Sequence, residues 1–322
     1  MDHGLLTIDS LMNDQKKHPH QITLTGFFIT LTGAIFFSTK AIFVKLAFHA
    51  THVDAITLLS LRMLFSLPFY LVAVWLIARK ENTRPLVKKD WLLIIAMGIL
   101  GYYLSSLFDF IGLQYVSAGL ERLILFLYPT FSVLINTFYF KTKLHRTQLI
   151  ALVLTYLGIG IAYFGELKLD TLNPNFFYGS FMIFLCAVTY SFYLVGTGRM
   201  VVRVGVTRYT AYSMLAATIG IFINFLAVHN INSIAFSTTL TGYSIALAVI
   251  ATVLPSFMMS NGMKRIGSNN VSIITSIGPV STIIQAHIFL GEQIIPAQII
   301  GTILVIAGVI LIGWQSRVSA LA

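Results

Sequence analysis

Residues 23–46 read TLTGFFITLTGAIFFSTKAIFVKL, an almost unbroken apolar stretch with its two lysines near the end. A helix needs about 20 such residues to cross the hydrocarbon core of a bilayer. Nine similar stretches follow, and we expect ten spans at roughly 23–46, 55–78, 91–113, 118–140, 147–165, 176–198, 209–229, 241–262, 268–290 and 294–314. Because lipid cannot satisfy open sheet edges, and these stretches are too long for barrel strands, the sequence predicts an all-α integral membrane protein.

The composition of the whole chain agrees with this fold class. Its 322 residues are 57% hydrophobic and only 10% charged, whereas a soluble protein carries about 25% charged residues. The chain is therefore too poor in charge to cover a wet surface. Its single cysteine, Cys186, excludes a disulfide framework and a cysteine-based metal cluster. We expect neither a metal nor a cofactor.

The basic residues indicate how the chain is oriented. Sixteen of the 21 lysines and arginines fall on the side that would hold both chain ends, two fall on the other side, and Lys40, Arg62 and Arg122 lie within spans. The positive-inside rule then places both termini in the cytoplasm and the protein in the inner (plasma) membrane. Residues 1–21 lack the apolar core of a signal peptide, so we expect a polar cytoplasmic tail. This distribution of charge also argues against nucleic acid as a partner.

The later part of the chain resembles the earlier part. Residues 113–163 align with residues 263–313 without a gap at an offset of 150, which pairs Pro129 with Pro279 in the middle of their spans. The first span similarly matches the sixth at an offset of 153. The sequence therefore predicts an internal duplication.

The expected halves are residues 22–165 and 176–316, each with five spans. An odd number of crossings turns the second copy upside down relative to the first. We therefore expect two inverted five-helix repeats around a central cavity, an arrangement typical of transporters that alternate between two open states.

Several short motifs occur in an order that is characteristic of one family. They are GAIFFSTKAIFVK at 33–45, Leu61-Arg62, Ser117-Ala118-Gly119, Pro129, Pro279 and Phe289-Leu290-Gly291-Glu292. Together they resemble the EamA-type ten-helix exporters of the drug/metabolite transporter superfamily over the whole chain beyond the tail. One departure is Phe140-Lys141-Thr142-Lys143, where the family usually has a Leu-Gly-Glu turn. The resemblance implies a basket of helices with spans five and ten at the periphery, and export of amino acids or related metabolites.

Charged residues inside spans are the first candidates for a substrate site, because each costs at least about 2.5–3.5 kcal/mol there. We expect Lys40 and Arg62 to face the cavity and to offer positive charge to a carboxylate or another anionic group. Glu121 would pair with one of them or titrate in a proton-coupled cycle. The alternative is a structural ion-pair network of these three residues with Asp109 and Arg122. We expect Arg122 to be structural, since it lies about 100° around the helix from Glu121.

Uncharged polar residues and prolines supply further candidates. The expected cavity-lining residues of the second half are Tyr190, Ser191, Thr275 and Ser276. Serine and threonine in membranes often bond their own helix backbone, so packing is the alternative for three of them. Pro129 and Pro279 are hinge candidates, because proline frees a carbonyl one turn earlier, with a tolerated kink as the alternative.

Small residues at matching positions of spans five and ten permit close helix packing, either within the monomer or in a homodimer. They are Ala151, Gly158, Gly301 and Gly308.

The function that the sequence favours is secondary transport of a small metabolite, most simply export of an amino acid or related organic solute. The alternative within transporters is an importer or exchanger of an anionic phosphorylated or nucleotide-linked metabolite. An integral-membrane enzyme is disfavoured, because HExxH and GxSxG motifs and intramembrane acidic clusters are missing from the sequence. A GxxxxGK[ST] motif is missing too, so the chain is not expected to use ATP.

Overall fold

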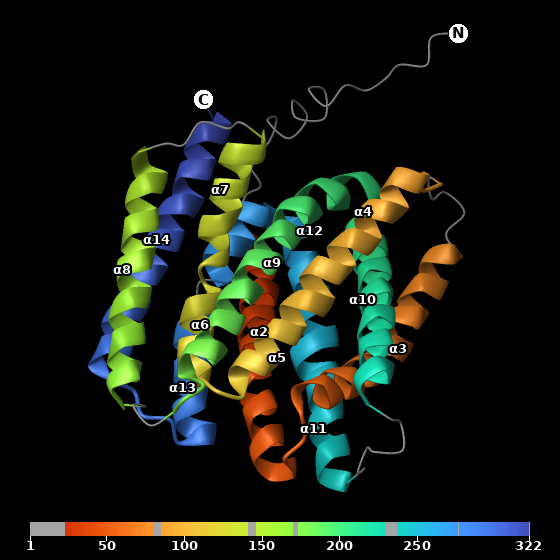
Figure 1. The fold of residues 1–322 in the computed structure, drawn as a ribbon. Helices are drawn as coiled ribbons and strands as arrows, with labels where there is room; N and C mark the ends of the chain where they lie inside the picture. The colour runs from red at the N-terminus through yellow and green to blue at the C-terminus, as the bar shows by residue number, and fades with distance from the viewer. Residues whose placement is uncertain are drawn as a thin grey trace.

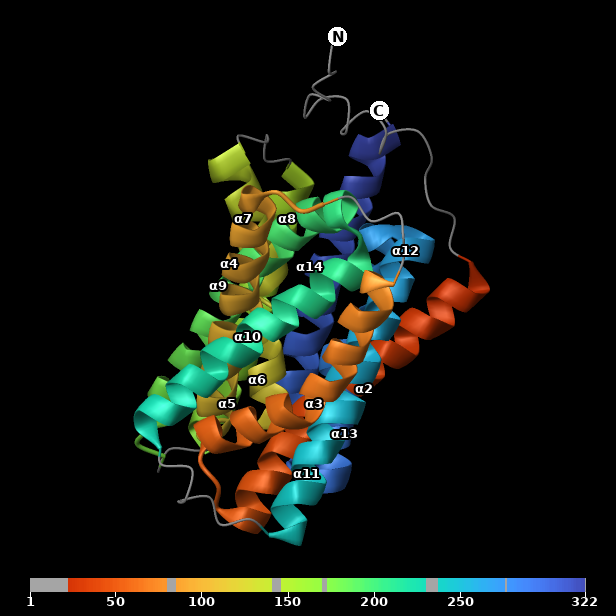
Figure 2. The same cartoon turned by 90° about the vertical axis from the view of Figure 1, so that its right-hand side faces the viewer.

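The computed structural model describes residues 23–79, 85–140, 146–169, 173–229, 237–275 and 277–321. All regular structure within these ranges is helical, as Figures 1 and 2 show. The helices before residue 170 are α2 (Leu24–Thr51), α3 (Ala55–Ala78), α4 (Lys88–Gly98), η1 (Ile99–Leu104), α5 (Ser105–Leu113), α6 (Ala118–Leu125), α7 (Tyr128–Phe140) and α8 (Arg146–Leu169). Those after it are α9 (Phe176–Val204), α10 (Val206–Val228), α11 (Thr238–Ala248), η3 (Val249–Val253), α12 (Leu254–Thr275), α13 (Gly278–Leu290) and α14 (Pro296–Leu321).

Eight helical segments of the described chain are long and apolar enough to cross a bilayer. Two further apolar helices, Gly278–Leu290 and Pro296–Leu311, are shorter. Large apolar side chains such as Phe164, Phe181 and Ile223 are exposed, which suits contact with lipid. The protein is thus a multi-pass α-helical membrane protein, as predicted, and the number of ten spans stays a prediction.

Two spans contain a short π-helical segment. Ile99–Leu104 separates α4 from α5, and Val249–Val253 separates α11 from α12. The two segments begin 150 residues apart, the same offset that aligns the sequence with itself. A π turn adds one residue to the helix, which changes by about 100° the face that the following residues present. Periodicity alone did not predict either segment.

Two helix breaks are also separated by an offset of 150. α6 ends at Leu125 and α7 begins at Tyr128, while α12 ends at Thr275 and α13 begins at Gly278. Pro129 and Pro279, expected within continuous helices, therefore each lie in the first turn of a new helix. A proline costs little at that position, because the first N–H groups of a helix have no partner within it.

The connection expected near residues 263–267 differs from the prediction, because α12 continues through it as a helix. Ile266 is fully buried there and lies against Gly26 of α2, where a side chain larger than hydrogen would collide with it. Burial against α2 favours a helical backbone in a stretch whose own propensity for helix is poor.

The helices are arranged with α8 and α14 side by side at one edge and with α3, α10 and α11 toward the other (Figures 1 and 2). Gly158 and Gly301 meet where α8 crosses α14, and an added Cβ at either would overlap the carbonyl of the other. Gly308 makes a similar approach to Ala151. The small residues of spans five and ten thus pack against each other within the monomer, and a homodimer through these spans stays a prediction.

Candidate functional site

The centre of the candidate site is a buried ion pair between Lys40 on α2 and Asp109 on α5. Lys40 Nζ lies 2.7 Å from Asp109 Oδ2 and 3.8 Å from Glu121 Oε1 on α6. Asp109 and Glu121 are both fully buried, and their carboxyl groups lie within electrostatic reach of one another. Asp109 follows the π segment η1, and Glu121 lies in the first turn of α6, where the helix dipole favours a negative charge. Two carboxyl groups therefore share one ammonium.

Three of the five residues in the ion-pair network considered from the sequence are therefore in contact. Lys40, Asp109 and Glu121 come together, whereas neither Arg62 nor Arg122 forms an ion pair among the described residues. Removing one member of such a buried set leaves an uncompensated charge and costs about 3–5 kcal/mol. A direct role of Lys40 or Glu121 in substrate binding stays a prediction.

Arg62 on α3 is buried beside this set. Its Nη2 donates a hydrogen bond to Ser106 Oγ at 3.0 Å, and its Cζ lies 5.0 Å from the centre of the Phe110 ring. Ser106 and Phe110 flank Asp109 on α5, so the guanidinium is held by the same helix that carries the partner of Lys40. Lys40 and Arg62 therefore both contact α5, and a direct role of Arg62 in substrate binding stays a prediction.

Arg122 on α6 is the least satisfied cation of the group. It is only 5% exposed, and its Cζ lies 5.4 Å from the centres of both the Phe37 and Phe126 rings. Within the described chain its guanidinium makes neither a hydrogen bond nor an ion pair. Burial of an unpaired ion costs several kcal/mol, whereas a cation–π contact returns only about 0.5–2 kcal/mol. Glu121, its neighbour on α6, lies within electrostatic reach of the guanidinium, and the structural role expected for Arg122 stays a prediction.

Tyrosines extend from Arg122 along α9. Tyr128 and Tyr190 lie within electrostatic reach of the guanidinium, and their rings meet edge to face with centroids 5.2 Å apart. Tyr190 also stacks on Tyr193, whose hydroxyl donates to that of Tyr102 at 2.7 Å. The row thus combines apolar ring faces with hydroxyl groups that can donate and accept hydrogen bonds.

The remaining sequence candidates are placed as follows. Thr275 is half-buried and hydrogen-bonds to Tyr128, which puts it beside the tyrosine row. Ser191 is fully buried and donates to Val188 O of its own helix at 2.6 Å, which is the packing alternative. Ser276 lies outside the described residues.

A polar cluster joins helices from both parts of the chain at the end of the bundle where α6 begins. We call it the Glu292 cluster, and it contains Lys45, Ser117, Glu166, Glu292 and Gln298. Ser117 donates to Glu166 at 2.7 Å, and Gln298 also donates to Glu166. Lys45 Nζ lies 4.0 Å from Glu292 Oε1.

Glu292 also completes the start of α6. Its carboxylate accepts hydrogen bonds from Ala118 N at 3.0 Å and Gly119 N at 3.4 Å, while Ser117 Oγ accepts from Leu120 N. The first N–H groups of a helix lack partners within it, so these bonds satisfy groups that would otherwise be unpaired. A side chain that precedes α14 therefore caps a helix that lies more than 170 residues earlier.

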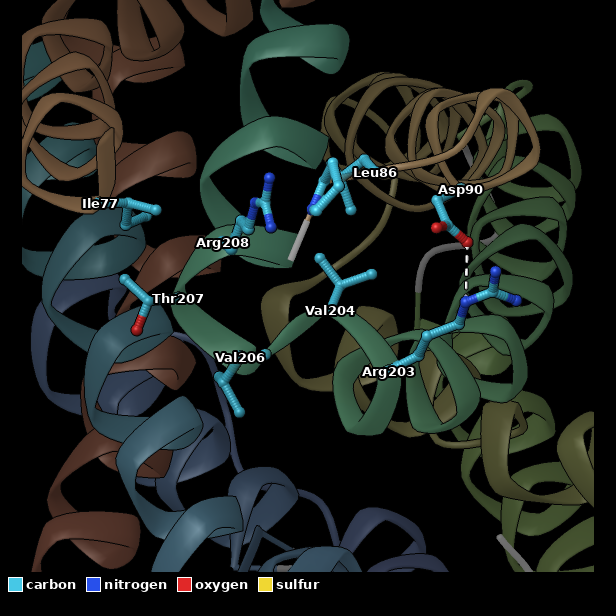
Figure 3. Close-up of a pocket in the computed structure, with 10 residues that line it drawn as sticks. Ile77, Leu86, Asp90, Arg203, Val204, Val206, Thr207 and Arg208 are labelled. Atoms are coloured by element: carbon cyan, nitrogen blue, oxygen red, sulfur yellow. Dashed lines mark ion pairs between the residues drawn. The ribbon is translucent and has the colours of Figure 1, made fainter. Parts of the chain in front are cut away.

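The opposite end of the bundle has an ion pair between α4 and α9. Asp90 is buried and its Oδ1 lies 2.9 Å from Arg203 Nε. The pair borders a hollow of about 290 Å³ that is also lined by Leu86, Thr207 and Arg208, as Figure 3 shows. The elements that meet here precede and follow residue 170, as they do at the Glu292 cluster.

Asp109 is the main site residue that was not a candidate from the sequence, where it appeared only as a member of the alternative ion-pair network. Charge balance could have found it: the spans hold three cations, and Glu121 alone could not compensate Lys40 and Arg62. The partners in the Glu292 cluster lie far apart in sequence, and no local pattern joins them.

Comparison with known proteins agrees with this arrangement. The model of the EamA-like transporter family matches residues 24–164 and, a second time, residues 177–314. The chain belongs to the EamA-like transporter family. The EamA-like assignment expected from the motifs is thereby confirmed, and the protein is a membrane transporter.

Individual relatives extend the comparison. The uncharacterized transporter YcbK of Bacillus subtilis (strain 168) is 31% identical over 281 residues, which is 86% of this chain and 88% of YcbK. An uncharacterized transporter of Archaeoglobus fulgidus is 20% identical over 84% of this EamA-like chain and 92% of its own. A solved crystal structure with 19% identity matches with a TM-score of 0.64 and covers 91% of this chain and 97% of its own, which supports the same fold.

Proposed function

We propose that this EamA-like transporter carries a small organic solute, most simply an amino acid or a related metabolite, out of the cell by alternating access between two inverted halves. The halves are residues 22–165 and 176–316, in ten spans, with both termini in the cytoplasm. The observation that carries the proposal is the recurrence of the π segments and the helix breaks at an offset of 150. Unusual backbone features that recur at one offset support a duplicated unit.

The positions of the inter-half contacts support the mechanism. The Glu292 cluster joins the halves at one end, and Asp90 with Arg203 joins them at the other. The buried charges of Lys40, Asp109 and Glu121 lie on α2, α5 and α6, between these two sets. Alternating access then requires that one set separates while the other persists, which exposes the buried site to one side at a time.

Counterflow into liposomes tests the transport function. The purified protein is reconstituted into vesicles loaded with a mixture of unlabelled amino acids and organic acids, and uptake of the same labelled solutes is followed. We expect at least one solute to accumulate transiently, and protein-free vesicles provide the control. Absence of counterflow for every solute, with a protein that is folded and inserted, contradicts the proposal.

The inverted arrangement has its own test. Reporter tags inserted after residues 165 and 316 are expected to lie on opposite sides of the membrane, because each follows five crossings of its half. If both tags report the same compartment, the halves are not inverted.

A further inference from the structure

The buried cations of this transporter differ in how fully they are paired. Lys40 contacts two carboxyl groups, and Arg62 bonds to Ser106. Arg122 alone among these three has neither an acceptor nor a carboxylate in contact within the described chain. Its hydrogen-bond donors are therefore available to a ligand.

Arg122 is surrounded by Phe37, Phe126 and Gly278, and we call this group of residues the Arg122 slot. The rings of Phe37 and Phe126 lie close to the guanidinium carbon. α13 begins beside it at Gly278, without a side-chain cap at its N-terminus. An uncapped helix start favours negative charge, so it acts in the same direction as the arginine.

The slot lies between the two halves of the chain. Arg122 and Phe37 come from α6 and α2, whereas Gly278 comes from α13, and Ser38 Oγ of α2 lies 3.4 Å from Gly278 O. The substrate of a transporter with paired halves binds where the halves meet. The slot therefore has the position that a substrate site needs.

We infer that the Arg122 guanidinium binds the carboxylate group of a monocarboxylate substrate in this slot. A planar guanidinium presents two parallel N–H donors, which match the two oxygens of a carboxylate. On α2, α3, α5 and α6, the buried cations Lys40, Arg62 and Arg122 exceed the buried carboxylates Asp109 and Glu121 by one charge. The other buried carboxylates, Asp90 and Glu166, have partners at the two ends of the bundle. One carboxylate balances this excess, whereas a phosphate dianion would exceed it. The inference rests on the proposed transport function and names the chemical class of its substrate.

Ligand-induced stabilisation tests this assignment. The purified full chain is heated in detergent with a panel of amino acids and short aliphatic and aromatic carboxylates, each paired with its own amide. We expect at least one acid to raise the melting temperature of the wild-type protein while its amide does not. If no acid stabilises the wild-type protein, or if acids and amides act equally, the assignment is overturned.

Three variants locate the binding group. Arg122→Met should abolish the rise in melting temperature that the acid causes. Arg122→Lys keeps the charge but loses the two parallel N–H donors, and it should weaken binding by about tenfold or more. Gly278→Ala should also weaken binding, since its Cβ would lie 2.6 Å from Arg122 Nη2 and displace the flexible guanidinium. Arg79→Met is the matched control, because Arg79 is an exposed arginine that stacks on Trp75. Unchanged affinity in Arg122→Met overturns the assignment.

The melting temperature without ligand separates a binding role from a structural one. Arg122→Met removes an unpaired buried charge, so the unliganded variant should melt at or above the temperature of the wild-type protein. A clearly lower melting temperature would show that Arg122 is structural and would overturn the inference. Counterflow distinguishes the two proposals. Transport of a solute that has no carboxylate overturns only the assignment of a carboxylate to Arg122. Binding of an acid without any transport overturns only the transport function.

Discussion

Lys40 and Arg122 are both buried cations, but the residues around them differ in kind. Lys40 lies against Asp109 and Glu121, and Arg122 lies against two aromatic rings. An ammonium between two carboxyl groups holds helices together, because its loss leaves two carboxyl groups without a counter-ion. A guanidinium between aromatic rings stays available to a ligand. The ring faces attract its charge but do not accept hydrogen bonds from its N–H groups, which point outward in the plane of the guanidinium.

At this scale we predict that Lys40→Met destabilises the protein strongly. The substitution leaves Asp109 and Glu121 buried without their cation, at a cost of about 3–5 kcal/mol. The measurement is thermal or denaturant unfolding of the purified variant without ligand. Lys45→Met is a control of the same chemistry near a bundle end, where Lys45 is less buried, and it should cost much less. Equal stability of Lys40→Met and the wild-type protein would contradict this description of the site.

At the scale of elements, the contact between α8 and α14 depends on small side chains. Gly158 faces Gly301 so closely that a Cβ would overlap the opposing backbone, whereas Gly160, two residues along α8, has open space around its Cα. We predict that Gly158→Leu destabilises the protein by about 1–3 kcal/mol or more, because the helices must separate. Gly160→Leu is the matched control and should be nearly neutral. Thermal unfolding of the two variants measures the difference, and equal effects would contradict the prediction.

The same scale shows what the sequence could and could not predict. Apolar length predicted membrane-spanning helices, because a bilayer imposes one length on every crossing. The π segment at Ile99–Leu104 and the break before Tyr128 were not predicted, because a shift of hydrogen bonds by one residue leaves the hydrophobic pattern almost unchanged. The partners of Lys40 required three-dimensional contacts, since Asp109 lies almost 70 residues away in the chain.

At the scale of the whole molecule, Cys186 offers a native reporter of opening. It is buried on α9, its sulfur lies 3.4 Å from Ser105 Oγ, and it is the single cysteine of the chain. We predict that Glu292→Gln, which weakens the contacts to Ala118 and Lys45, speeds modification of Cys186 by a membrane-impermeant maleimide from the outer side.

Rates of labelling in oriented vesicles measure this effect, with a several-fold increase expected. Asp90→Asn should instead speed the labelling of Cys186 from the inner side, because it breaks the ion pair with Arg203 at the other end of the bundle. Gln293→Ala, a change at an exposed neighbour of Glu292, should leave the rate unchanged, and Cys186→Ser gives the background. An equal increase from both sides with Glu292→Gln would contradict the assignment of that cluster to one end.

The family model matches the chain twice, and the cap that Glu292 places on α6 makes these two matched segments, here called the first and second copies, unequal partners. At the offset of 150, the residue that corresponds to Glu292 is Thr142, which carries no carboxylate. The second copy therefore lends a helix cap to the first, and the first copy has no acidic side chain to return at that place. Without the second copy, α6 would keep its Ser117 cap but lose the acceptor of Ala118 N and Gly119 N, at a cost of about 0.5–2 kcal/mol. A second copy of the front segment, with Thr142 in place of the glutamate, could not supply that acceptor, so the two copies are not interchangeable.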